Sequence, residues 1–77
     1  MHFVVNYQAD YGTEETFGYF NTATDAINWM KSDVEFNIEN AKKNGVKLIA
    51  ETINSGNTIK IPEYGTWMVT KVTPVGI

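Results

Sequence analysis

The sequence predicts a two-layer α+β sandwich with the element order ββαβββ, in which one helix packs on a mainly antiparallel sheet. Apolar and polar residues alternate in several short segments at both ends of the chain, a pattern typical of half-buried strands. Between these segments, apolar residues recur at steps of three and four, as on one face of a helix. The chain has 77 residues, so we expect a single domain over residues 1–77.

A β-hairpin is expected over residues 2–20. Residues 3–9 and 15–20 alternate in polarity, and the segment between them carries the turn-forming residues Asp10 and Gly12. The alternation predicts one set of side chains on the face that meets the helix. This set consists of Phe3, Val5, Tyr7, Ala9, Phe17 and Tyr19.

One helix is expected over residues 22–44. Thr22 and Asp25 have the spacing of a capping box, which satisfies free backbone N–H groups at a helix start. Gly45 follows Asn44 and suits the left-handed position after a helix end. Apolar residues between these ends form one core-facing stripe. The stripe consists of Ala23, Ala26, Ile27, Met30, Val34, Ile38 and Ala41.

Three further strands are expected in the second half of the chain, where the period of the apolar pattern returns to two. Pro62 ends one of these strands or marks it as an edge strand. Residues 73–77 are expected to form a short tail. The strands are expected over residues 46–53, 58–61 and 67–72, with turns at residues 54–57 and 63–66.

The residue composition argues against catalysis and against metal or cofactor binding. Without cysteine, the chain has no thiol nucleophile, disulfide or cysteine metal ligand. Its single histidine, His2, lies at the N-terminal end, where a catalytic base cannot be held accurately. Glu14 and Glu15 are expected to point to opposite faces of a strand, so they cannot act on one bond. We therefore expect a protein that is not an enzyme, with no catalytic residue, no metal and no cofactor.

Charge and hydropathy indicate the setting in which the protein acts. The net charge is −3 and there is no arginine, so no nucleic-acid partner is expected. We find no signal peptide pattern and no apolar run that could span a membrane, and we expect a cytoplasmic protein with no membrane partner. The exclusive use of lysine, together with eight asparagines and seven isoleucines, indicates AT-rich coding, as in a low-GC bacterium or one of its phages.

Two aromatic residues of the helix lie outside its core-facing stripe. Trp29 and Phe36 are seven residues apart, so they lie one above the other, about 60° to 80° beyond the stripe at 100° per residue. One interpretation is that the sheet or the C-terminal tail covers them and extends the core. The other is that they anchor a partner protein, with the carboxylates of Asp25 and Asp33 orienting and attracting a basic partner.

Two tyrosines are further candidates for a contact surface. The turn sequence Asp10–Thr13 returns in a similar form as Glu63–Thr66. Either each turn independently requires a glycine, or the two turns bring Tyr11 and Tyr64 together as one contact patch at a rim of the sheet.

The face of the sheet opposite the helix is predicted to carry apolar side chains that one helix cannot cover. We expect a second copy of the chain to cover this face around a two-fold axis, giving a homodimer. The dimer-face candidates are Val4, Phe20, Ile49 and Ile53.

These features favour a small non-enzymatic protein-binding module, such as an adaptor, inhibitor or accessory protein of a bacterium or phage. The alternative is a structural component that binds only copies of itself. A single-stranded nucleic-acid binder would stack bases on Tyr7, Phe17 and Tyr19 beside lysines. A phosphate-mimicking inhibitor would use the acidic residues of the helix. Too few charges of either sign are present to favour these last two classes.

Overall fold

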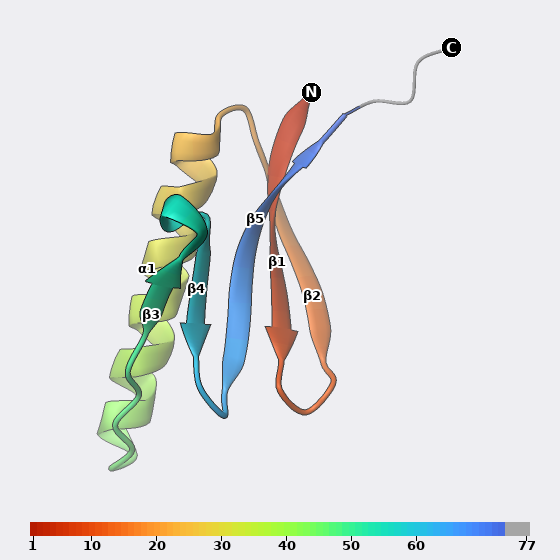
Figure 1. Ribbon diagram of the computed structural model, residues 1–77. Coiled ribbons are helices and arrows are strands. Elements are labelled where there is room, and N and C mark those ends of the chain that lie inside the picture. The colour runs from red at the N-terminus through yellow and green to blue at the C-terminus, as the bar shows by residue number, and fades with distance from the viewer. Residues whose placement is uncertain (74–77) are drawn as a thin grey trace.

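The computed structural model describes residues 1–73, and these form one antiparallel five-stranded sheet with one α-helix packed on it (Figure 1). The predicted ββαβββ sandwich is confirmed, whereas residues 74–77 of the expected tail lie outside the described residues. The strand order is β2-β1-β5-β4-β3. The elements are β1 (His2–Ala9), β2 (Glu14–Phe20), α1 (Ala23–Lys43), β3 (Glu51–Ile53), β4 (Thr58–Ile61) and β5 (Gly65–Val72), with a short 3₁₀ turn, η1 (Asn54–Gly56), between β3 and β4.

Helix α1 begins and ends at the residues that its sequence signals predict. The Oγ1 atom of Thr22 accepts a hydrogen bond of 3.1 Å from the backbone N–H of Asp25. At the other end, the backbone N–H of Asn44 donates to the Ala41 carbonyl, and Gly45 has a φ of 79°. A left-handed residue at this position stops the helix while satisfying its last carbonyls.

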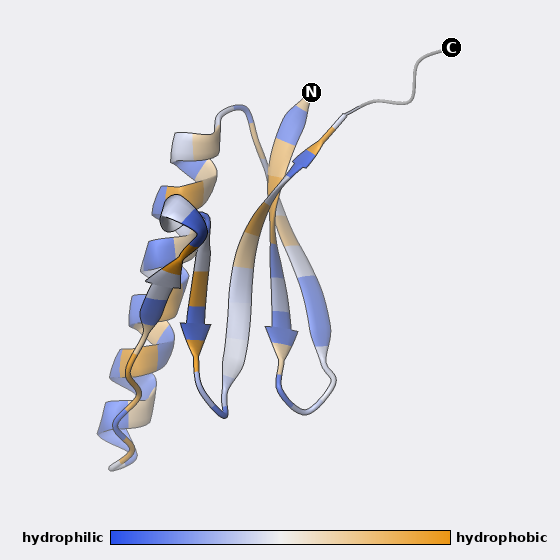
Figure 2. Ribbon diagram, viewed as in Figure 1, coloured by the Kyte–Doolittle hydropathy of each residue, from blue (hydrophilic) through white to orange (hydrophobic). Residues whose placement is uncertain are grey.

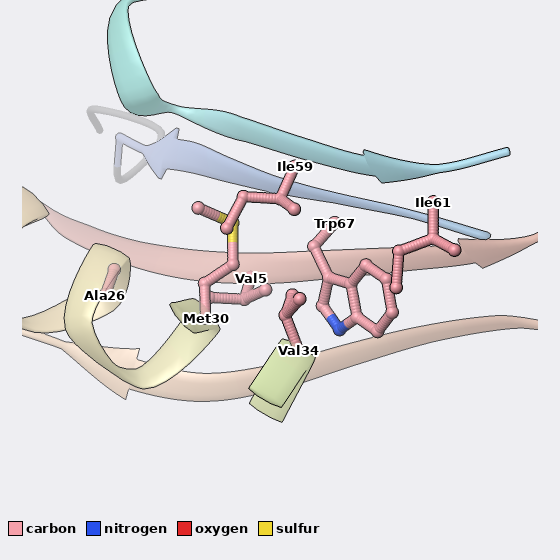
Figure 3. Close-up of a cluster of buried hydrophobic side chains, with 7 residues drawn as sticks. All are labelled: Val5, Ala26, Met30, Val34, Ile59, Ile61 and Trp67. Carbon is pink, nitrogen blue, oxygen red and sulfur yellow. The ribbon is translucent and has the colours of Figure 1, made fainter. Parts of the chain in front are cut away.

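The core lies between α1 and the face of the sheet formed by β1, β5 and β4. Figure 3 shows the Met30 side chain directed towards Ile59, and Val34 beside the Trp67 ring. Because these side chains are almost fully buried, they supply most of the hydrophobic stabilisation of a domain this small. The buried cluster consists of Val5, Ala26, Met30, Val34, Ile59, Ile61 and Trp67.

A bulge in β2 changes which residues of that strand face the helix. Phe3 of β1 pairs with Phe20 and Val5 pairs with Phe17, so β2 uses one residue more than β1 between these pairs. Gly18 has a φ of 79° and absorbs the extra residue. Phe17 and Phe20 therefore both pack against the core. The predicted placement of Tyr19 on the helix face and of Phe20 on the opposite face is wrong.

The strand predicted over residues 46–53 forms a ladder only at its end, in β3. Glu51 pairs with Lys60 of β4, so continuing this register would set Ile49 opposite Pro62. Proline has no N–H to donate to a ladder. The next residue, Glu63, has a φ of 64° and turns the chain towards β5. Residues 46–50 are therefore extended in front of α1 and have no strand partner among residues 1–73 (Figure 1).

The face of the sheet opposite the helix is more polar than predicted. In its centre, Asn6 Nδ2 donates to Thr70 Oγ1 at 2.7 Å, and Thr16 Oγ1 donates to Asn6 Oδ1 at 3.0 Å. Val4 lies on this face but is only 8% exposed. Phe20, for its part, packs against the core on the helix side. These two residues therefore add little apolar surface to the expected dimer face.

Candidate functional site

The two edges of the sheet differ in how well they are protected from pairing with another strand. The β2 edge has the bulge at Gly18 and begins with the carboxylates of Glu14 and Glu15. Bulges and charges are the usual means by which natural sheets block edge-to-edge pairing. The β3 edge has neither a bulge nor a proline between residues 46 and 53, and its two charges, Lys47 and Glu51, are of opposite sign.

The residues 46–53, called here the open edge, combine free backbone groups with exposed apolar side chains. Residues 47–50 have no strand partner and take no part in the backbone hydrogen bonds of turns and loops, within residues 1–73. Val46 is 50% exposed, Ile49 is 64% exposed and Ile53 is 43% exposed. Figure 2 shows hydrophobic stretches along this segment between α1 and β3. Such an edge is a template for an additional strand.

Grooves lie on both sides of the open edge. A groove of about 580 Å³ separates it from the last turns of α1, where Ile38 and Lys42 face Val46 and Leu48. A second groove of about 330 Å³ lies between Ile49 and the end of β4. Leu48 is half-buried against the core, which fixes the orientation of the segment. A bound strand could therefore insert side chains into the groove beside α1.

The helix aromatics predicted as a partner anchor have different environments. Trp29 is half-buried, and its ring lies 4.9 Å from that of Phe17 and 6.0 Å from that of Phe20, measured between centroids. The sheet therefore covers Trp29 and extends the core, as the first interpretation holds. Phe36 is 63% exposed and stacks on no aromatic ring of the described residues. It stays a binding candidate on its own.

Asp33 is part of a polar network that holds the helix on the sheet. Its Oδ2 atom accepts a hydrogen bond of 2.9 Å from Nε1 of Trp67, a residue that is 1% exposed. Its backbone carbonyl accepts from Nδ2 of Asn37 at 2.8 Å, and Asn37 Oδ1 accepts from the hydroxyl of Tyr64 at 2.5 Å. The sequence pattern did not indicate this network. A buried tryptophan needs an acceptor for its indole N–H, and this need could have indicated it.

The two turns with similar sequences lie at the same rim, but their tyrosines point differently. The backbone N–H of Asp10 donates to the carbonyl of Tyr64 at 3.1 Å, which joins the turns. Tyr11 is 91% exposed, whereas Tyr64 is half-buried with its ring nearly parallel to that of Trp67. The two side chains therefore form no common patch. Asp25 is exposed at the helix start, away from this rim.

The described residues contain no group of three or more His, Asp or Glu residues placed to hold a metal ion. His2 stacks on Tyr19 with ring centroids 3.8 Å apart. Burial raises the pKa of Tyr7, and the nearby groups Tyr64 and Asp10 raise it further. A raised tyrosine pKa keeps the hydroxyl protonated near neutral pH, so less of the phenolate that could accept a proton is present.

A base-stacking surface is not assembled either. Tyr7 and Phe17 pack against the core on the helix side, whereas Tyr19 lies elsewhere and stacks on His2. The aromatic residues considered for nucleic-acid binding therefore do not share an open face.

The comparisons with known proteins supply no relative. No protein-family model, no curated protein and no solved structure matches this chain. Within residues 1–73, no helix is long and apolar enough to cross a membrane.

Proposed function

We propose that the protein is a non-enzymatic protein-binding module that receives an additional β-strand at its open edge. The observation that carries this proposal is the run of unpaired backbone at residues 47–50, within residues 1–73. This run contains the exposed side chain of Ile49, and the exposed side chains of Val46 and Ile53 lie before and after it. In strand addition, main-chain hydrogen bonds supply affinity and pockets for alternate side chains supply specificity. The groove between the open edge and α1 provides such a pocket.

The setting is proposed on the sequence alone. Exclusive use of lysine over arginine supports an accessory protein of a low-GC bacterium or one of its phages, acting in the cytoplasm. The role would be that of an adaptor or inhibitor, because the chain offers an unpaired edge to which a partner's strand can add.

The experiment is a selection of extended peptides on the immobilised protein, using a displayed library of random peptides. We expect enrichment of peptides with apolar residues at every second position, since these fit the alternate pockets of a strand edge. Ile49→Lys, which places a charge in the middle of the open edge, is expected to abolish their binding. The matched control is Tyr19→Lys on β2, an equally exposed apolar residue at the opposite edge, and it should leave binding unchanged.

Two further variants separate this surface from the helix surface. Phe36→Ala and Trp29→Ala are each measured for peptide binding and for folding by circular dichroism. If Phe36→Ala removes binding and Ile49→Lys does not, the helix face is the binding surface and strand addition is refuted. Trp29→Ala is expected to lower stability, because Trp29 packs on Phe17 and Phe20.

A further inference from the structure

We infer that the strand received at the open edge is the same segment of a second copy of the chain, paired antiparallel around a two-fold axis beside Ile49. This inference rests on the proposed function, because it names the partner of the same edge. It differs from the expected dimer through the sheet face, since it uses neither Val4 nor Phe20, which the chain itself covers.

Geometry restricts how two open edges can pair. Two antiparallel edge strands of one sheet are related by a two-fold axis perpendicular to the sheet, so each residue lies opposite a residue of the same face. Glu51 and Ile53 lie on the face opposite the helix, because their partners Lys60 and Thr58 alternate with the buried Ile59. By the same alternation, Lys47 and Ile49 belong to that face.

The charges of the open edge are complementary to themselves in one register. When Ile49 lies opposite Ile49, Lys47 of each copy lies opposite Glu51 of the other. Opposite charges directly across an antiparallel pair stabilise it, and like charges destabilise it. A register centred on Lys47 or on Glu51 sets like charges against each other. A register centred on residue 48 or 50 sets one of these charges against the apolar side chain of Ile49.

The same register covers part of the apolar surface that the single chain leaves exposed. Ile49, which is 64% exposed, meets its own copy at the axis. On the helix face, Val46 lies opposite Thr52, and the half-buried Leu48 lies opposite Ala50. The pairing would extend two five-stranded sheets into one continuous sheet, in which the second copy pairs those backbone groups of residues 47–52 that point away from β4.

The experiment is a charge-exchange test of self-association by sedimentation velocity, from low micromolar to near-millimolar concentration. The first variant is Lys47→Glu. The second is Glu51→Lys combined with Lys60→Glu, which keeps opposite charges between β3 and β4 within the chain. Each variant alone turns both attractive pairs of the dimer into repulsive ones, so we expect self-association at least about tenfold weaker than in the unaltered chain. An equimolar mixture of the two variants restores both pairs and should dimerise like the unaltered chain.

Ile49→Lys should also give a monomer, and Tyr19→Lys at the β2 edge should not. Circular dichroism of each variant confirms that the fold is retained.

A chain that stays monomeric throughout the concentration range overturns the inference, as does a mixture that stays monomeric while the unaltered chain dimerises. If the monomer still selects extended peptides, the proposed function stands without the dimer. If dimerisation follows the charge exchange and no peptide binds, the inference stands and the protein is a structural homo-oligomer.

Discussion

The hydrogen bond from Trp67 Nε1 to Asp33 Oδ2 makes a measurable contribution to stability. Asp33→Ala removes the acceptor of an indole N–H whose residue is 1% exposed. Hydrogen bonds to charged groups contribute about 1.5–3 kcal/mol. Alanine recovers up to about 0.7 kcal/mol through its higher helix propensity. The expected net loss in the free energy of unfolding is therefore about 1–2 kcal/mol.

Urea unfolding followed by far-ultraviolet circular dichroism measures this loss. With a slope of about 1 kcal/mol per molar urea for a small domain, the midpoint should fall by about 1–2 M. The melting temperature should fall by roughly 4–16 °C. Asp33→Asn keeps an oxygen acceptor and should lose less. Glu35→Ala, at an exposed position of the same helix, should change stability by no more than about 0.5 kcal/mol.

A double-mutant cycle identifies the partner of Asp33. Trp67→Phe keeps an aromatic ring but removes the N–H, so Asp33→Ala should cost little in that background. The reasoning is refuted if Asp33→Ala lowers stability equally in both backgrounds, or if it lowers stability no more than the Glu35 control.

Three other predictions concern the core and its rim. Met30→Ala should lower the free energy of unfolding by about 2–5 kcal/mol in the same urea assay, because Met30 is 0% exposed and leaves a cavity. Gly65→Ala should cost about 1–3 kcal/mol, since the added Cβ would lie 2.5 Å from Tyr7 Cε1, and most of that cost should disappear in a Tyr7→Leu background. Above pH 10.0 the unfolded chain releases the Tyr7 proton before the folded chain does. The contribution of Tyr7 to the free energy of unfolding is therefore fully present below pH 10.0 and is lost as the pH rises through the raised pKa. Urea titrations across this range should show that Tyr7→Phe removes part of the fall.

Local signals predicted the helix and the first hairpin closely. The capping residue Thr22, the left-handed Gly45 and the spacing of Ala26, Met30 and Val34 depend on neighbours in the sequence, and the structure follows them. The bulge at Gly18 was not predictable in this way. A glycine in a strand permits a bulge, but only the pairing with β1 shows that an extra residue is accommodated there.

Long-range pairing also decides the candidate site. Residues 46–50 alternate like a strand, and nothing local distinguishes them from β3. They have no partner because the register of Glu51 with Lys60 carries the segment past Pro62 and the turn at Glu63. Ile49 and Ile53 were singled out from the sequence as surplus apolar residues of a sheet face. Their exposure at the edge follows from the sheet order, which the sequence alone does not specify.

The first and last strands of the chain are neighbours in the middle of the sheet. β1 pairs with β5 along its whole length, from His2 opposite Val72 to Ala9 opposite Gly65. During synthesis on the ribosome, β1 is made before the other strands of this sheet, and its central partner β5 is made after them. Until then the helix has no Trp67 to pack against, and the hairpin formed by β1 and β2 has an open side. Folding of this sheet must therefore wait for β5, and a truncation before Gly65 removes the strand that joins the two halves of the sheet.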